Sequence, residues 1–440
     1  MPIRQTPVLL TPQSARRLTP REAIRAAKVG AVATRHLAPA LARRRSRNVE
    51  SVAPTLRHAV IDLGPPFVKL SQLVASSPGL FPAAISDSLR ELLDAAPPAP
   101  FPPIRGAIEA GLRRPLESAF ASVEEEPLAA ASVAQVHAAT TTDGQRVVVK
   151  VLRPDVERQF LTDLRLLRVI ARAASRLSKS ARVINPVAVV DDVVIQLCRE
   201  LDLELEAASM DRFSANLRAY GSNDLVRVPA VHHDLCGPGV LTMERIDGIK
   251  VDDVMRLNLT GLDLTRLLKA GVRAWIEAAL QHRFFHGDVH AGNLFVDTEG
   301  RVVFIDFGIV GELDEATADI VRRGIVALLH DRDFQTVTDC LVELGANLGY
   351  GLDSARAAAA IQRLAEPLLD KPLSELNYQE VFFSALRQAA AKGVQVPSSL
   401  VLLIKQILYF ERYAKLVAPD YGLLSDTFLI EFLLDDEPTS

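Results

Sequence analysis

The sequence has little cysteine and no secretory signal, and each absence excludes a class of protein. Its three cysteines, Cys198, Cys236 and Cys340, are far apart in the chain and form no CxxC pair. This usage is typical of a reducing, cytosolic compartment, where cysteines pack in the core and do not form disulfides. The N-terminus lacks the continuous apolar segment of a signal peptide. We therefore expect a cytoplasmic protein.

Long hydrophobic runs are also missing. The best candidate, SLVLLIKQILYF at 399–410, is interrupted by Lys405 and Gln406. A helix needs about 20 predominantly apolar residues to cross a bilayer, so we expect no membrane-spanning segment. Any membrane contact is then peripheral, on the inner face of the membrane.

Aromatic residues are scarce as well, at 5% of 440 residues, although hydrophobic residues reach 49%. Much of that apolar content is Ala in periodic segments, which favours a helix-dominated protein with some strand. A chain of this length can hold two or three domains or one large two-lobed domain.

The net charge of −4 conceals a basic N-terminal arm. Residues 1–60 contain 12 Lys and Arg against 2 Asp and Glu, and the remaining chain contains 38 against 52. Such an arm can meet an anionic membrane, a nucleic acid or the acidic body of the protein itself. We expect no nucleic-acid partner and leave the other two alternatives open.

The most informative stretch is HGDVHAGNLFVDTEGRVVFIDFG at 286–308. Two short apolar runs separated by DTEG predict a catalytic loop (286–293), a hairpin and a metal loop (306–308). This arrangement brings Asp288, Asn293 and Asp306 to one end of a small sheet. Asp and Asn oxygens suit Mg²⁺, and Asp288 could orient or deprotonate a hydroxyl, as phosphoryl transfer requires. The plainer alternative is a Gly/Asp-rich turn in an ordinary core.

A metal site built on histidine is a second alternative for this region. His232 and His233 are adjacent, and His286 and His290 are four residues apart. Imidazole nitrogens suit zinc better than the Mg²⁺ that the Asp and Asn oxygens indicate. We therefore rank the histidine site below the magnesium site.

Upstream, SVAQVHAATT and RVVVKVL are separated by Asp143-Gly144, which predicts a β-hairpin. The small residues before the hairpin would let the backbone approach a ligand closely. Lys150 ends the triple-Val run and should point inward, where it needs an anionic partner. An exposed lysine on an edge strand is the alternative.

Four carboxylates alternate with Leu farther along the chain, at Glu200, Asp202, Glu204 and Glu206. On an exposed helix they would repel one another, so we expect some of them to face cations, with Lys150 and Lys69 as candidates. A solvated acidic face is the alternative. GVLTMERIDG then predicts a strand that leaves its sheet at Glu244, forming a hinge between two lobes whose backbone is free to bond a purine.

Together these residues resemble the UbiB-like atypical protein kinases, a family implicated in coenzyme Q (ubiquinone) biosynthesis and other isoprenoid-lipid metabolism. The resemblance covers about residues 60–435 and rests on five motifs in order: PLAAASVAQVH (127–137), VVVK ending at Lys150, ELDLELEA (200–207), HGDVHAGN and IDFG. It implies an α+β, two-lobed, protein-kinase-like fold. The expected parts are a basic, partly disordered arm with an amphipathic helix (1–54), a helical N-terminal extension (55–117), a kinase-like N-lobe with inserted helices (118–247) and a helix-rich C-lobe (248–440).

The resemblance also implies roles for the site residues. Lys150 would contact the α and β phosphates of ATP or ADP and pair with Glu206. Asp306 and Asn293 would hold Mg²⁺, and Asp288 would occupy the position of the catalytic base. The alanine-rich loop that replaces a glycine-rich loop would cover the nucleotide through Ala130, Ala131, Ser132 and Val133, next to the Glu244 hinge.

A gating role is implied for the N-terminal extension. Lys69 and Gln72 occupy the family's Lys-x-Gly-Gln positions and would engage Glu200 and Asp202, covering the place where a protein substrate would bind. This sequence departs from the family pattern at Ser71, Ser77, Gly79 and Ala134. The change at Ala134 stiffens the nucleotide loop.

The resemblance implies an Mg-dependent ATPase or phosphotransferase linked to isoprenoid-quinone or other lipid metabolism. A lipid or quinone ligand is expected, and so is peripheral membrane contact through the basic arm. One alternative is a small-molecule phosphotransferase of the aminoglycoside or choline kinase type. Another is a nucleotide-gated, lipid-binding pseudokinase or chaperone. The sequence does not indicate an oligomeric state.

Overall fold

The computed structural model describes residues 20–42, 49–64, 98–177, 198–219, 223–344, 353–369 and 398–419, with the shorter pieces 67, 71, 88, 187, 190–191, 194, 421, 426–429 and 431–434. The chain divides into two compact units. The first comprises Met1–Ala99, Ala130–Ala134 and Arg153–Cys198, and the second comprises Pro100–Ala129, Gln135–Leu152 and Arg199–Ser440. This division cuts across the expected boundaries, because the segment after Arg153 joins the N-terminal helices.

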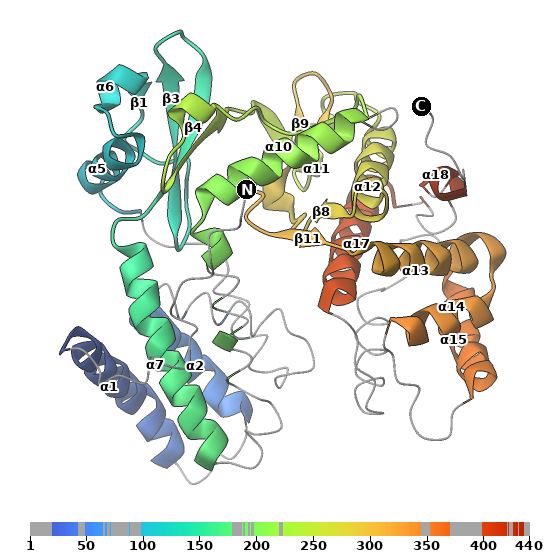
Figure 1. Ribbon diagram of the computed structural model, residues 1–440, viewed down its shortest axis with the longest axis horizontal. Coiled ribbons are helices and arrows are strands. Elements are labelled where there is room, and N and C mark those ends of the chain that lie inside the picture. Colours follow the sequence, from blue (N-terminus) through green and yellow to red (C-terminus); the bar gives the residue numbers. More distant parts are fainter. Residues whose placement is uncertain are drawn as a thin grey trace. The chain divides into compact units, whose positions relative to one another are not determined.

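Among the described residues of the first unit are three helices, α1 (Pro20–Ala42), α2 (Val49–Leu63) and α7 (Val156–Leu177), and α1 packs on the other two (Figure 1). Arg25 of α1 forms a two-pronged ion pair with Asp163 of α7, with N–O distances of 2.5 and 2.6 Å. It also donates to the Leu63 carbonyl at 2.6 Å. Part of the basic arm therefore docks on its own unit, while its contact with lipid stays a prediction.

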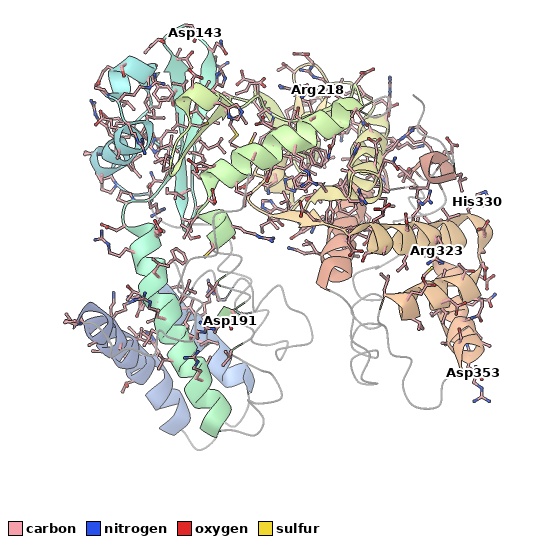
Figure 2. The ribbon with its side chains drawn as sticks, in the orientation of Figure 1. Asp143, Asp191, Arg218, Arg323, His330 and Asp353 are labelled. Atoms are coloured by element: carbon pink, nitrogen blue, oxygen red, sulfur yellow. The ribbon has the colours of Figure 1, made fainter. Side chains whose placement is uncertain are left out.

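The second unit begins with α5 (Phe101–Leu112) and α6 (Leu116–Ala119), followed by a sheet in the order β1-β3-β4-β6 with β2 paired to β3, of whose strand residues Ala130 and Ala134 are assigned to the first unit. These strands are β1 (Phe120–Val123), β2 (Ala129–Ala130), β3 (Ala134–Thr141), β4 (Arg146–Leu152) and β6 (Val240–Glu244). The predicted hairpin is confirmed. Asp143 lies at its turn (Figure 2), and Gly144 has a φ of +88°, which glycine adopts without a steric penalty.

Strand β4 lies inside this sheet, between β3 and β6, and its side chains alternate in burial. Val147, Val149 and Val151 are fully buried on one face. Lys150 lies on the opposite face, and its side chain is only 14% exposed. The alternative of an exposed lysine on an edge strand is therefore wrong.

The part of the second unit that the structure describes also contains two further sheets and a set of helices. One sheet has the order β5-β10-β9-β7, from β5 (Val226–Arg227), β7 (Gly248–Lys250), β9 (Leu294–Asp297) and β10 (Val302–Phe304), and the other pairs β8 (Phe284–His286) with β11 (Val310–Glu312). Strands β9 and β10 are antiparallel, which confirms the hairpin predicted between the two loops. The helices are α10 (Leu203–Ala219), α11 (Val254–Asn258), α12 (Leu264–Leu280), α13 (Glu315–Val326), α14 (Phe334–Glu343), α15 (Ser354–Leu369), α17 (Ser398–Val417) and α18 (Glu431–Leu434), with short helical turns at His233–Leu235, Ala291–Asn293, Ala327–Asp331 and Thr427–Leu429.

Aspartates set the starts of several of these helices, because a carboxylate at the N-cap satisfies backbone N–H groups of the first turn. Asp263, Asp314 and Asp333 accept such bonds at α12, α13 and α14. Asp353, labelled in Figure 2, does the same ahead of α15. Helices α13, α14 and α15 pack in succession (Figure 1). Within the described residues, no helix combines the length and the apolar character that crossing a membrane requires.

Candidate active site

A cluster of three charged side chains, Lys150, Glu206 and Asp306, brings together β4, α10 and the metal loop. Lys150 Nζ donates to Glu206 Oε1 at 2.7 Å and Oε2 at 2.9 Å, and to Asp306 Oδ1 at 3.1 Å. The Glu206 side chain is 2% exposed, whereas that of Asp306 is 47% exposed. The structure thus joins three predicted site residues that are far apart in sequence. The exposed part of the Asp306 carboxylate is accessible to a ligand.

The three side chains of this Lys150 cluster shift one another's pKa values. Burial would lower the pKa of Lys150, but the carboxylates of Asp306 and Glu206 outweigh burial and raise it. Burial raises the pKa of Glu206 to about 7, although Lys150 opposes the shift. Desolvation would raise the pKa of Asp306, but Lys150 and the Gly308 N–H hold it well below its usual range. Two carboxylates facing one ammonium group favour a further cation at Asp306.

The backbone at Asp306 has a conformation that serves this cluster. Its φ of +59° lies in the left-handed region, which is costly for a residue with a side chain and persists where the surroundings hold it. The Gly308 N–H donates to Asp306 Oδ1 at 3.3 Å, and the next residue, Phe307, is 1% exposed. The buried ring and the tight turn together direct the carboxylate toward Lys150.

The catalytic loop is fixed at its start by His286, which is fully buried at the end of β8. Its Nδ1 accepts from the Asp288 N–H at 3.1 Å, its Nε2 donates to the Ile305 carbonyl at 2.9 Å, and its own carbonyl accepts from Trp275 at 2.9 Å. Burial lowers the pKa of His286, so the ring is neutral. Both ring nitrogens are engaged, so His286 cannot serve the histidine metal site. No group of three or more His, Cys, Asp or Glu side chains in the described part of the chain is arranged to hold a metal.

Asn293 ties the catalytic loop to the metal loop. Its side-chain Nδ2 donates to the Asp288 backbone carbonyl at 2.9 Å, and its backbone carbonyl accepts from the Ile305 N–H at 2.9 Å. This orientation leaves Oδ1 as the atom of Asn293 that can ligate a cation. A carboxylate and an amide oxygen are hard donors of the kind that Mg²⁺ prefers, so Asn293 and Asp306 fit a magnesium site.

Aromatic rings connect α10 to both loops in a way that the sequence analysis missed. The Phe307 ring lies 5.1 Å from Phe213 and 4.7 Å from His286, measured between centroids. Phe213 is fully buried and follows Glu206 by seven residues. That spacing is two helical turns, so the two side chains share a face of α10. The seven-residue spacing from Glu206 is the sequence signal that could have revealed Phe213.

The predicted nucleotide loop and gate are only partly described. Residues 130–133 belong to the first unit, where the Ala131 N–H donates to the Ala134 carbonyl at 2.9 Å and the Arg153 N–H donates to the Val133 carbonyl at 2.8 Å. Their contact with a nucleotide stays a prediction. Lys69 and Gln72 lie outside the described residues, as do Ser77 and Gly79, whereas Ser71 is buried.

Their expected partners, Glu200 and Asp202, lie just before α10 in the second unit. Asp202 Oδ1 accepts from the Leu205 N–H at 3.0 Å, and the Asp202 carbonyl accepts from the Glu206 N–H at 3.1 Å. Asp202 therefore caps the helix that carries Glu206. The gating role of Glu200 and Asp202 stays a prediction.

The backbone at Glu244 was expected to be free to bond a purine. For the N–H group this expectation is wrong, because the Glu244 N–H donates to the Ala230 carbonyl at 2.8 Å. The Glu244 carboxylate pairs with Arg227 at 2.7 Å. Arg227 also pairs with Asp297 at 2.8 Å, which joins β6 to the second sheet. This ion network fixes the end of β6. It could not be predicted from the sequence, because Arg227 comes from a two-residue strand.

Helix α17 also reaches the catalytic loop, through Gln406 and Tyr413, which bond to its backbone. In the sequence, Gln406 is noticeable only as an interruption of an apolar run. A buried amide in the middle of an apolar helix needs hydrogen-bond partners, and that requirement was the available signal.

The fold and the site place this chain in the class of kinase-like proteins, with a strand lysine paired to a helix glutamate and with catalytic and metal loops joined by a hairpin. Comparison with known families identifies the class more closely: residues 91–341 match the ABC1 atypical kinase-like domain and residues 361–421 match the UbiB helical domain. The chain belongs to the UbiB-like family of atypical kinases.

Known relatives agree with this assignment. An uncharacterized protein of Mycobacterium tuberculosis is 39% identical over 92% of this chain and 83% of its own. A probable protein kinase UbiB of Pseudomonas putida is 37% identical over 84% of this chain and 68% of its own. The solved structure of the M. tuberculosis Rv3197–erythromycin complex matches with a TM-score of 0.56 and 23% identity, over 79% of this chain and 86% of that one. This last likeness concerns the fold alone.

Proposed function

We propose that this protein binds ATP together with Mg²⁺ and catalyses the transfer of the γ-phosphoryl group to water or to an alcohol. The observation that carries the proposal is the Lys150 cluster, in which a buried ammonium group is held by Glu206 beside the half-exposed carboxylate of Asp306. Asn293 bonds to the Asp288 carbonyl and, through its own backbone carbonyl, to the N–H of Ile305 next to Asp306, which supports a place for Asp288 and Asn293 in the same site.

In this proposal each side chain has a distinct task. Lys150 contacts the α and β phosphates, and Asp306 with Asn293 Oδ1 holds the cation, which when bound neutralises charge on the β and γ phosphates. Asp288 accepts the proton of the attacking hydroxyl. A bond forms between that oxygen and the γ-phosphorus, the bond to the β-phosphate oxygen breaks, and ADP leaves with the electron pair.

For the acceptor we propose a compound of isoprenoid-quinone or other lipid metabolism. This part rests on the likeness to proteins named UbiB, which are described as probable protein kinases. The basic arm supplies cationic surface for peripheral contact with an anionic membrane.

The substitution Lys150→Met tests the role given to the cluster. We expect ATP affinity to fall at least about 10-fold, because the charge-assisted contact with the phosphates is lost. Affinity is measured by titration with a fluorescent ATP analogue, and Lys250→Met on β7 is the matched control. Unchanged affinity in Lys150→Met would contradict the proposed phosphate contact. Tight binding by the wild type without any turnover would instead favour the nucleotide-gated pseudokinase.

A further inference from the structure

Helix α17 forms hydrogen bonds to the catalytic loop on both sides of Asp288. Gln406 Nε2 donates to the Gly287 carbonyl at 2.7 Å, and Gln406 Oε1 accepts from the Val289 N–H at 2.9 Å. The Gln406 side chain is fully buried. A single amide group thus binds one peptide before Asp288 and one peptide after it, which needs a donor and an acceptor on the same side chain.

A second residue of the same helix also binds the backbone of the catalytic loop. Tyr413 follows Gln406 by two helical turns and is 3% exposed, and its hydroxyl donates to the Val289 carbonyl at 2.9 Å. Both polar groups of Val289 are therefore bonded to α17. The backbone that presents Asp288 is held by a helix more than one hundred residues later in the chain, within the same compact unit.

Lys405, the neighbour of Gln406, brings a positive charge to the same place. Its Nζ lies 3.6 Å from Asp288 Oδ1, and its side chain is 36% exposed. This distance is an ion-pair contact and is too long for a hydrogen bond. The ammonium group can therefore turn from Asp288 to an incoming anion without breaking a strong bond. His290 flanks the other oxygen, with Nε2 at 3.7 Å from Asp288 Oδ2.

We propose that the consecutive pair Lys405–Gln406 completes the catalytic centre. Lys405 is a catalytic residue whose ammonium group contacts the γ-phosphoryl group beside Asp288, and Gln406 is a positioning residue that fixes the loop carrying Asp288. This inference rests on the proposed phosphoryl transfer. In that step negative charge spreads over the γ-phosphoryl oxygens next to the attacking hydroxyl, where a fixed cation stabilises the transition state.

The substitution Lys405→Met tests the phosphate contact. We expect turnover to fall about 100-fold and ATP affinity to fall more than ADP affinity, because only ATP carries the γ-phosphate that Lys405 contacts. ADP affinity should stay within about twofold, and Lys405→Arg should restore part of the turnover because it keeps the charge. The control is Arg412→Met, at an exposed position on the same helix. Wild-type turnover in Lys405→Met, or equal losses of ATP and ADP affinity, would overturn the assignment.

The substitution Gln406→Met tests the positioning role, because it keeps the size of the side chain and removes both bonds. We expect kcat to fall about 10- to 100-fold while KM for ATP and the affinity for ADP stay within about twofold. Tyr413→Phe, which removes one hydroxyl, should show a smaller loss of the same kind. If Gln406→Met fails to fold, it will lose ADP binding, and the kcat of Tyr413→Phe then tests the positioning role in its place. Wild-type kcat in a folded variant of either kind would overturn the positioning role.

The same assays separate this inference from the proposed function. If the wild-type protein turns over no ATP with Mg²⁺, both fail. If the wild type is active and Asp306→Asn is not, while Lys405→Met and Gln406→Met match the wild type, only the role of α17 fails.

Discussion

At the scale of single residues, Gly287 lies where the catalytic loop packs against the segment that follows the metal loop. Its N–H donates to the Ile309 carbonyl at 2.9 Å, and an added Cβ would lie 2.9 Å from Ile309 Cγ2. No side chain fits there unless one of the loops moves. The small residue before Asp288 is therefore required by packing.

We predict that Gly287→Ala lowers ATP turnover at least about 10-fold, because the added methyl group displaces Asp288 from the metal loop. ADP affinity should change little, since Lys150 and Glu206 are held by other elements. Steady-state kinetics with nucleotide titration checks both. Gly106→Ala is the control, because nothing lies within 4 Å of its added Cβ. Unchanged turnover in Gly287→Ala would show that the packing has no role in catalysis.

The sequence was most informative about residues whose chemistry requires partners. Lys150 was expected to need an anion and Glu206 to need a cation, and the structure joins them across 56 positions. Sequence spacing alone cannot bring such distant residues together, and the resemblance to a family supplied the pairing. Gln406 was missed because its two partners are backbone groups of another loop, and no side-chain pattern identifies those.

At the scale of elements, the tilted and edge-on ring contacts of Phe307 with Phe213 and His286 connect α10 to both loops. We predict that Phe213→Ala destabilises the protein by about 3–5 kcal/mol through the cavity that it leaves. It should also reduce ATP turnover, because α10 carries Glu206. Denaturant unfolding and kinetics measure the two effects, and Leu205→Ala, at a 45% exposed position on α10, is the control. Equal stability of the two variants would contradict the structural role of these ring contacts.

The ion network at the end of β6 predicts a dependence of stability on pH. Burial would raise the pKa of Asp297, but the Arg301 N–H and the guanidinium groups of Arg227 and Arg301 outweigh burial and lower it. The stabilisation is then complete above the unfolded-state pKa of about 3.9 and is lost as pH falls through the lower folded-state value.

Asp297→Asn should therefore be less stable than the wild type at pH 7, and the difference should shrink below about pH 4. Unfolding curves from pH 3 to pH 7 provide the test, with Asp319→Asn as the matched control at an exposed position on α13. A difference that stays constant across this range would contradict the depressed pKa.

Most elements could be predicted from local patterns, and the error at Glu244 arose where pairing is not local. The two hairpins follow from turn residues between apolar runs, and α12, α13, α14 and α15 begin at aspartates that cap them. Glu244 was misjudged because its backbone partner, Ala230, comes from an irregular segment. Burial and pairing of that kind depend on the whole fold and not on the strand pattern.

At the scale of the whole molecule, the second unit contains the Lys150 cluster, both loops and α17, so every contact that carries the proposed chemistry lies within one compact unit. The first unit contains the alanine-rich loop 130–133 and the N-terminal helices. Lys69 and Gln72, the predicted gate, lie outside the described residues, so the gate itself is not described. It stays a prediction that a structure with bound nucleotide can examine.

If the Lys150 cluster supports Mg-dependent turnover of ATP, the carboxylate of Asp306 is essential to it. The rate of ADP release from ATP with Mg²⁺ is measured in the wild type and in Asp306→Asn, with the exposed Asp319→Asn as control. We expect turnover by the wild type and the control and a loss of about 100-fold or more in Asp306→Asn. Nucleotide binding without Mg²⁺ should be retained by all three proteins. Equal turnover by the wild type and Asp306→Asn would contradict the role of the Lys150 cluster in catalysis.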